Sequence, residues 1–425
     1  MQTFQFKTFS RKQRMILNWW TDGSPAKDAD GIIADGAIRS GKTVAMSLSF
    51  VAWACERFNG ERFGICGKTI GSLRRNVVSP LKSILPGRGY SVRERRGDNL
   101  LVIGRGDTVN EFYLFGGKDE GSQDLIQGVT LAGCLLDEVA LMPESFVTQA
   151  TARCSVEGSK LWFNCNPEGP MHWFKKEWVD RSSELRMNYL HMTMEDNLSL
   201  SESIKSRYRN MYAGVFFQRY ILGLWAMAEG LIYPMFTDEN IYTDESRPIA
   251  LYSTARRVIA CDYGTTNPCV FLDVWDDGQT IWIDHEYRWD SQSDAARRTG
   301  QPSKTDAQYG EDMAVFMGED PAKQCMIIVD PSAASFIAEL RQRGFYVKAA
   351  DNEVLDGIRK TASLLARRRV MIHDSCRGLI SELQSYAWDD KARISGEDKP
   401  LKTMDHAPDA LRYFVNSLPE WRISA

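Results

Sequence analysis

The sequence predicts an α/β protein built from two domains. Its 425 residues exceed what one hydrophobic core usually organises. Short apolar runs alternate with helical patterns in each half of the chain, which is typical of α/β layers. A stretch rich in Pro, Asp, Glu and Thr, with little periodicity, separates the halves. We therefore expect domains at 1–227 and 249–425, joined by a linker at 228–248.

The composition narrows the class of protein. Hydrophobic residues make up 43% and charged residues 25%, the values of a soluble globular protein. The net charge of -4 gives no general attraction to nucleic acid, so such a partner must meet a local basic surface. No apolar stretch approaches the roughly 20 residues needed to span a bilayer, and the start lacks an apolar signal core. The nine cysteines form no Cys-x-x-Cys pair, so we expect reduced thiols in the cytoplasm.

The first half predicts a largely parallel sheet. A helix is expected from about residue 42 to 58, where a Gly-rich turn ends, and further helices are expected within 171–226. The expected strands are the apolar runs at 31–36, 62–67, 99–104, 111–117, 131–137 and 160–166.

A phosphate-binding loop follows the first of these strands. GAIRSGKT has the G-x-x-x-x-G-K-T spacing and opens the expected helix, the context that this motif requires. Glycines let the backbone approach phosphates, and the helix N-terminus offers fixed positive dipoles. In this loop Lys42 is expected to reach the terminal phosphates of ATP and Thr43 to bind Mg²⁺. The other expected nucleotide-binding residues are Gly36, Ser40 and Gly41.

A phosphate loop needs an acid on a neighbouring strand to organise its metal. LAGCLLDE supplies Asp137 and Glu138 at the end of an apolar run. We expect Asp137 to hold the Mg²⁺ shell and Glu138 to polarise the attacking water. Taken alone, the pair is equally compatible with an acidic turn after a buried strand.

Four further polar residues are candidates near the nucleotide. Asn164 and Asn166 end the strand in LWFNCNPEG and can sense the γ-phosphate, although an Asn-Pro turn without a role is the alternative. The amide of Gln13 can read the adenine edge or face solvent on a helix. Arg39 lies inside the loop, where it can stabilise γ-phosphate charge or point to solvent or DNA.

The second half predicts a different order of elements. Three adjacent strands come first, and strands then alternate with helices, as in ribonuclease-H-like folds. The strands are expected at 256–262, 268–275, 279–286, 325–330, 344–349 and 369–373, and the helices at 333–342, 353–367, 375–386 and 406–417.

Carboxylates stand at the ends of two of these strands. Asp262 ends an apolar run in VIACDYGTT, and Asp330 ends another in CMIIVDPS. Asp409 comes from a late helix, and Glu286, at the end of another strand, is a weaker fourth candidate. Such a cluster can bind two Mg²⁺ or Mn²⁺ ions and support hydrolysis of a phosphodiester. Singly, each acid is compatible with a cap or turn role.

The late helix leaves the third metal ligand open. MDHAPDALRYFV contains Asp405, His406 and Asp409, and the two acids share a face only if the helix reaches Asp405. Asp405 is alternatively the N-cap, since Pro408 suits a first helical turn. An Asp-x-Gly-Thr turn at Asp262 can also cradle ATP, as in actin-like folds, but the phosphate loop already serves that purpose.

Together these pieces resemble the large terminase subunit of tailed bacteriophages along nearly the whole chain. The motifs occur in the family's order: FSRKQRMIL, GAIRSGKT, LLDE, FNCNPEG, TMEDNLSL, GLWAMAEGLIYPMF, IACDYG, VDPSAASFIAEL and DHAPDALRY. The resemblance implies an N-terminal P-loop ATPase domain that translocates DNA and a C-terminal ribonuclease-H-like nuclease domain that cuts concatemeric DNA.

The resemblance also implies roles and partners. Asn164 and Asn166 fall in the segment that couples hydrolysis to motion. Asp262, Asp330 and Asp409 match the nuclease metal ligands, and His406 falls where some members place another side chain at the metal. The implied partners are double-stranded DNA, the portal protein and the small terminase subunit, in the host cytoplasm and at the procapsid portal. A ring of identical subunits is implied during packaging, and a monomer in solution is compatible with it.

Two other function classes remain compatible with the motifs. A helicase-nuclease of DNA repair would normally need a second motor domain, but carboxylates occupy the second half here. A nucleotide switch or scaffold without turnover would not need Glu138. Four basic clusters can bind DNA phosphates or form solvated faces: Arg74, Arg75 and Lys82; Arg93, Arg95 and Arg96; Arg297, Arg298 and Lys304; and residues 367–369.

Overall fold

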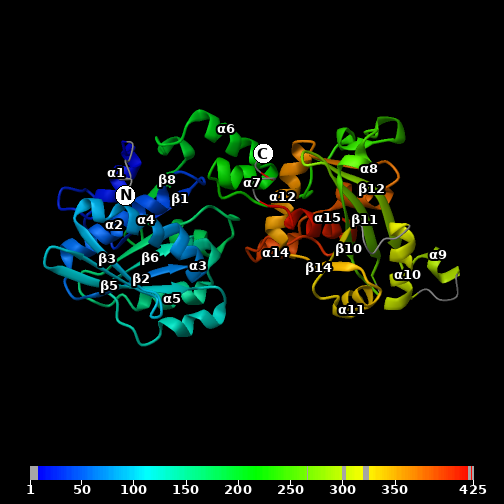
Figure 1. Cartoon of the computed structure of the whole chain (residues 1–425). Helices are drawn as coiled ribbons and strands as arrows, with labels where there is room; N and C mark the ends of the chain where they lie inside the picture. The colour runs from blue at the N-terminus through cyan, green and yellow to red at the C-terminus, as the bar shows by residue number, and fades with distance from the viewer. Residues whose placement is uncertain (1–7, 266, 299–302, 319–324, 420–422, 424–425) are drawn as a thin grey trace. The chain divides into compact units, whose positions relative to one another are not determined.

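The computed structural model describes residues 8–265, 267–298, 303–318, 325–419 and 423, which fold as two compact units (Figure 1). Unit 1 comprises the described residues up to Lys205 together with Phe217–Met227 and Ile394–Glu397. Unit 2 comprises Ser206–Phe216, Ala228–Arg393 and the described residues from Asp398 onward. The stretch predicted as a linker, 228–248, groups with unit 2, and the predicted functional boundaries stay a proposal.

Unit 1 is organised around an eight-stranded sheet among its described residues, in the order β3-β4-β5-β2-β6-β7-β1-β8. All neighbouring pairs are parallel except β3 with β4 and β4 with β5, so the prediction of a mostly parallel sheet is confirmed. The strands are β1 (Gly31–Gly36), β2 (Arg62–Gly67), β3 (Tyr90–Arg95), β4 (Leu100–Arg105), β5 (Thr108–Gly116), β6 (Gly133–Asp137), β7 (Lys160–Asn164) and β8 (Met187–Met192).

Helices pack against both faces of this sheet. Adjacent residues of β1 show why: Ile32 belongs to one buried cluster and Ile33 to another, because successive side chains point to opposite faces. Rings from α2, β2, β5 and β7 interlock in the first cluster through Phe50 and Trp162. The α-helices through residue 216 are α1 (Arg11–Asn18), α2 (Lys42–Arg57), α3 (Ile70–Leu73), α4 (Ser79–Ile84), α5 (Glu144–Ala152), α6 (Glu202–Met211) and α7 (Gly214–Phe216).

Unit 2 contains a seven-stranded sheet within the described residues, in the order β14-β13-β10-β11-β12-β15-β9. Strand β11 runs antiparallel to both β10 and β12, and β13, β14, β15 and β9 pair in parallel with their neighbours. This arrangement confirms the ribonuclease-H-like prediction. The strands are β9 (Ile241–Tyr242), β10 (Arg256–Asp262), β11 (Cys269–Asp276), β12 (Ile281–Trp289), β13 (Met326–Val329), β14 (Tyr346–Ala349) and β15 (Val370–His373).

The last helix of unit 2, His406–Asn416, packs against β10 and β11, and this packing buries ten of its residues. None of the helices in the described parts of the chain is long and apolar enough to cross a membrane. The α-helices that follow residue 250 are α8 (Leu251–Thr254), α9 (Asp294–Arg298), α10 (Asp306–Met317), α11 (Ala334–Gln342), α12 (Val354–Ala366), α13 (Arg377–Ser385), α14 (Asp390–Ile394) and α15 (His406–Asn416).

The secondary-structure prediction missed three strands, β3, β8 and β9. Only helices were expected within 171–226, yet β8 lies there and pairs with β1 along its whole length. Its sequence, MNYLHM, does not alternate regularly between apolar and polar residues. The strand lies at the sheet edge, and its Tyr189 and His191 contact Asp35 of β1. The predicted linker contains β9, which extends the sheet of unit 2 by pairing with β15.

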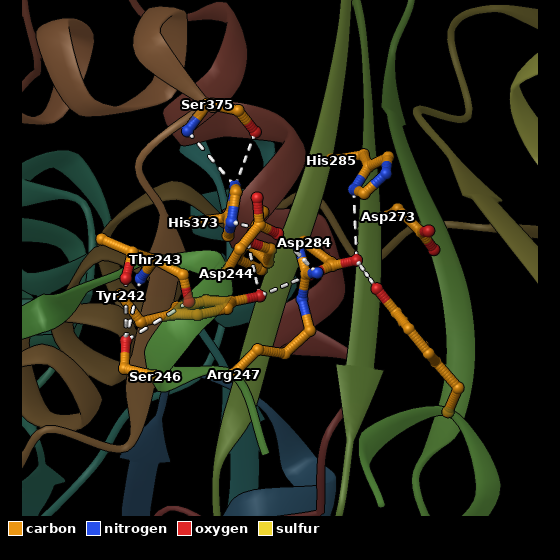
Figure 2. Close-up of polar contacts among 12 residues, drawn as sticks. Tyr242, Thr243, Asp244, Ser246, Arg247, Asp273, Asp284, His285, His373 and Ser375 are labelled. Atoms are coloured by element: carbon orange, nitrogen blue, oxygen red, sulfur yellow. Dashed lines mark hydrogen bonds and ion pairs between the residues drawn. The ribbon is translucent and has the colours of Figure 1, made fainter. Parts of the chain in front are cut away.

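A buried carboxylate explains why residues 241–252 belong to unit 2 (Figure 2). Asp284 of β12 accepts hydrogen bonds from Tyr242 at 2.7 Å, Arg247 at 2.8 Å and Tyr252 at 2.5 Å. His285 contacts the same carboxylate at 3.1 Å. Burial opposes ionisation of Asp284, but the hydrogen bonds from His285, Tyr252 and Tyr242 outweigh it and hold its pKa well below the usual range.

Asp284→Asn is therefore expected to destabilise unit 2 by about 1–3 kcal/mol, because buried donors lose their charged acceptor. The depressed pKa of Asp284 contributes stability that is fully present above its unfolded pKa of about 4 and is lost as pH falls from there toward the folded pKa. The raised pKa of His285 contributes stability that is lost as pH rises through that pKa. Calorimetry should thus show the largest difference in Tm from wild type near pH 5; a difference independent of pH would contradict this explanation.

Candidate functional site

The phosphate loop spans the turn between β1 and α2. Gly36 has φ 121°, and a Cβ added there would lie 1.9 Å from the Met192 carbonyl oxygen. Gly41 has φ 86°, and a Cβ there would lie 2.4 Å from Nε2 of Gln13. Both positions therefore require glycine. The exposed Arg39 also has a positive φ, 58°, and its carbonyl accepts from Asn197 Nδ2 at 2.7 Å.

The amine of Lys42 is buried inside this loop. Its Nζ donates to the carbonyl oxygens of Gly36 at 2.9 Å and Ala37 at 2.7 Å, and to Asn166 Oδ1 at 3.1 Å. Burial lowers the pKa of Lys42 to about 8. The side chain is thus still mostly protonated at pH 7, at the centre of the loop.

The acidic pair lies beside the loop, at the end of β6. Thr43 donates from Oγ1 to Asp137 Oδ1 at 3.0 Å. Asn164 joins both acids, since its Nδ2 donates to Asp137 at 2.9 Å and its Oδ1 accepts from the Glu138 amide at 3.2 Å. Burial raises the pKa of both Asp137 and Glu138, and Glu138 has a left-handed backbone with φ 58°. A strained residue at this position is typical of a functional site.

The N-terminal helix brings Gln13 to the loop. Ser10 and Gln13 form a reciprocal capping box, with Gln13 N donating to Ser10 Oγ at 3.2 Å and Ser10 N donating to Gln13 Oε1 at 3.0 Å. This fixes the amide of Gln13, whose Nε2 donates to the Ser40 carbonyl at 3.4 Å. The structure therefore gathers Gln13, Asn164, Asn166 and the acidic pair around the phosphate loop in unit 1.

In unit 2 the strand-end acids Asp262 and Asp330 are brought together. Strands β10 and β13 pair in parallel, with Cys261 opposite Val329, so the residue following each pair lies at the same edge of the sheet. Tyr413 of α15 spans them, since its hydroxyl donates to Asp330 Oδ2 at 2.7 Å and lies 3.5 Å from Asp262 Oδ1. No sequence pattern indicated this role for Tyr413, which has the spacing of a core aromatic.

The start of α15 supplies the remaining predicted groups. His406 Nδ1 lies 2.9 Å from Asp262 Oδ2. Burial raises the pKa of Asp262, the His406 contact opposes this, and the nearby charges of Asp409 and Asp405 raise it further. Asp405 occupies the N-cap position without a capping hydrogen bond from its side chain, and Asp409 lies in the first turn.

Two basic side chains, Arg412 and Lys402, form ion pairs with the carboxylates at the start of α15. Arg412 contacts Asp409 Oδ1 at 3.0 Å, and Lys402 Nζ lies 3.3 Å from Asp409 Oδ2 and 3.2 Å from Asp405 Oδ2. Among the described residues, no group of three or more His, Cys, Asp or Glu side chains is arranged to hold a metal ion. The oxygen donors do fit a hard divalent cation in their chemistry.

Other predicted features stand outside this arrangement. Glu286 accepts from the Leu379 amide at 3.1 Å, at the start of α13, so its carboxylate is turned to that helix. In the turn after Asp262, Thr266 lies outside the described residues. In the basic cluster of Arg74, Arg75 and Lys82, two residues form ion pairs with Glu94. The Arg74 pair is 3.1 Å long and the Lys82 pair 2.9 Å.

These units define an α/β protein that joins a P-loop fold to a ribonuclease-H-like fold. A family model described as the N-terminal part of the terminase large subunit, T4likevirus-type, matches residues 33–239. The large terminase subunit of Escherichia phage T5 is 25% identical over 341 residues, covering 77% of this chain and 73% of that protein.

Solved structures extend the similarity to both units. The large terminase from a thermophilic bacteriophage is 53% identical, with a TM-score of 0.89 over 97% of this chain and 99% of that one. The same phage protein in complex with ATP-γ-S matches with 51% identity and a TM-score of 0.85, over the same shares. The chain belongs to the large terminase subunit family of bacteriophages.

Proposed function

We propose that this chain hydrolyses ATP to ADP and phosphate to drive double-stranded DNA into a viral procapsid, and that a metal-dependent endonuclease in the same chain cuts concatemeric DNA. The observation that carries this proposal is the presence of two separate chemical sets in two compact units. Family membership supports a role in DNA packaging. The similarity to a terminase that binds ATP-γ-S supports ATP as the nucleotide of unit 1.

The roles in unit 1 follow from charge and hydrogen bonding. The buried ammonium of Lys42 would exchange its bonds to Gly36 and Ala37 for phosphate oxygens, which are stronger acceptors. Thr43 and Asp137 already share a hydrogen bond and would together hold Mg²⁺, whose charge would offset that of the phosphates. Glu138 would orient the attacking water, because its raised pKa favours proton acceptance.

Three polar side chains would support this chemistry. Gln13 would contact the base or the loop, and Arg39 would stabilise charge on the γ-phosphate. Asn166 contacts Lys42 and Asn164 contacts both acids, so each is suited to report the state of the phosphates to β7. This supports the coupling role proposed for the pair.

In unit 2, Asp262, Asp330 and Asp409 would hold Mg²⁺ or Mn²⁺, with Asp405 and His406 at the edge of the site. The bound ions would supply charge stabilisation for hydrolysis of a phosphodiester. Tyr413 would fix the spacing of Asp262 and Asp330 through its hydroxyl. Lys402 and Arg412 would balance the charge of Asp409.

The proposed partners are those of a packaging motor: double-stranded DNA, a portal protein and a small terminase subunit. A ring of identical subunits at the procapsid portal, within the host cytoplasm, would allow continuous translocation. Basic residues outside the Glu94 pairs, such as Arg297 and Arg298, are exposed and suited to phosphate contacts without sequence preference.

The test is an assay of one purified chain for three activities. ATP hydrolysis is measured with DNA and portal-bearing procapsids, plasmid cutting with Mn²⁺, and strand separation on a forked duplex. Hydrolysis and cutting without strand separation are expected. Strand separation would favour a helicase-nuclease, and tight ATP binding without turnover in the complete mixture would favour a nucleotide switch.

A further inference from the structure

A buried carboxylate that was not among the predicted site residues lies at the entrance to the phosphate loop. Asp35, the residue before Gly36, is 0% exposed. It accepts from the Trp225 indole Nε1 at 2.6 Å and from the Tyr189 hydroxyl at 3.0 Å, and His191 Nδ1 lies 2.9 Å from it. A buried carboxylate is costly unless such donors surround it. Asp35 therefore holds the side chains of Trp225, Tyr189 and His191 in place beside the phosphate loop.

The donors come from two different elements of unit 1. Tyr189 and His191 belong to β8, where His191 is directly opposite Asp35 in the parallel pairing with β1. Trp225 belongs to residues 217–227, which we name the loop strap; it begins with the π-helical turn Phe217–Ile221 and lies in the chain between two segments of unit 2, Ser206–Phe216 and Ala228–Arg393. Asp35 thus connects the loop strap to the strand that leads into the phosphate loop.

The loop strap also contacts the phosphate loop directly. Ile38 N, an amide of the phosphate loop, donates to the Tyr220 carbonyl at 2.8 Å. Gly223 has φ 74°, and a Cβ there would lie 2.8 Å from Ala37 N and 3.1 Å from Gly36 Cα. At Gly223 the strap backbone therefore approaches the loop backbone so closely that only glycine fits.

A third contact ties the strap to the segment after β7. Arg219 is 1% exposed, and its guanidinium donates to the Ala226 carbonyl at 2.7 Å and to Glu168 at 3.2 Å. Glu168 is two residues from Asn166, the side chain that contacts Lys42. Gly223 packs against the backbone of Gly36 and Ala37. These are the same two residues whose carbonyl oxygens accept hydrogen bonds from Lys42.

We propose that Asp35 is a positioning residue for ATP turnover, which acts by anchoring the loop strap through Trp225 against Gly36–Ile38. This inference rests on the proposed ATPase function. The anchored strap holds the loop backbone from which Lys42 takes its hydrogen bonds. Because the strap leads covalently into unit 2, the Asp35–Trp225 bond also carries changes in the loop toward Ala228.

The test compares two Trp→Phe variants of the full chain. Trp225→Phe removes the donor to Asp35 and keeps an aromatic ring. Trp20→Phe is the matched control, because Trp20 is 5% exposed and donates to Ser49 Oγ at 3.2 Å, with no part in the phosphate loop. With DNA and procapsids, Trp225→Phe should lower kcat about tenfold with KM for ATP nearly unchanged, whereas Trp20→Phe should match wild type.

A spectroscopic readout separates positioning from simple loss of structure. Adding ATP-γ-S should change the tryptophan fluorescence of wild type and of Trp20→Phe, and this change should be absent in Trp225→Phe and in Asp35→Leu, which has no acceptor for the Trp225 indole. Equal fluorescence changes in all variants, or equal kcat for the two Trp variants, would overturn the inference. If wild type itself hydrolyses no ATP in the complete mixture, the proposed function fails instead.

Discussion

Lys42→Ala is expected to lower ATP hydrolysis by at least about 100-fold, the scale seen when a preorganised charge donor is removed from a reaction site. The structure gives the reason. The ammonium of Lys42 is buried at the centre of the loop and makes hydrogen bonds to Gly36 and Ala37 that phosphate oxygens would replace. The rate of plasmid cutting should stay within about twofold of wild type, because the proposed metal ligands Asp262, Asp330 and Asp409 lie in unit 2.

The control for this variant is another lysine of unit 1. Lys160 also bonds main-chain carbonyls, including that of Lys27 at 3.0 Å, but lies outside the phosphate loop. Lys160→Ala should therefore keep its ATP turnover, measured as released phosphate with DNA and procapsids present. Unchanged turnover in Lys42→Ala would rule out the phosphate-loop assignment, and Lys42→Met, which keeps most of the side-chain volume, guards against a packing defect.

The second large effect is expected for Asp262→Asn, which should lower plasmid cutting in Mn²⁺ by at least about 100-fold while leaving ATP hydrolysis unchanged. An amide cannot supply the anionic oxygen that a hard divalent cation prefers. Asparagine keeps the volume of Asp262 and can still accept the contact from Tyr413, so the fold of unit 2 should survive.

Asp312→Asn is the matched control for this nuclease variant. Asp312 of α10 is a partly buried carboxylate of the same unit that accepts from Tyr287 at 2.6 Å, but it stands apart from the predicted metal ligands. Gel analysis of supercoiled plasmid should show wild-type cutting for Asp312→Asn. If Asp262→Asn cuts as fast as Asp312→Asn, the nuclease site has been placed on the wrong residues.

Much of the fold followed from local sequence patterns. The phosphate loop was predictable because its glycines, lysine and threonine are close in the chain and each has a local physical reason. Strand-end acids such as Asp137 and Asp262 were recognisable because a carboxylate that ends an apolar run is unusual. Parallel strands end at one edge of a sheet, so the meeting of Asp262 with Asp330 could be expected once the fold class was predicted.

Contacts between distant segments were beyond the same reasoning. The Asp35–Trp225 bond joins residues 190 positions apart, and no local pattern marks either one. Tyr413 has the spacing of a core residue on α15, yet its hydroxyl reaches two carboxylates. The strand β8 was missed because polar side chains of this edge strand contact Asp35 of β1. These polar residues interrupt the alternation of apolar and polar residues on which strand prediction depends.

We expect the proposed motor and nuclease to be separable sites on one chain. The sharpest measurement of that separation is the protection of linear, already cut DNA from added nuclease when procapsids, ATP and the Asp262→Asn chain are mixed. We expect protection equal to wild type, because packaging of cut DNA needs only the ATPase set, and none with Lys42→Ala. Loss of protection in Asp262→Asn, or protection by Lys42→Ala, would show that the two sites are not separable in this way.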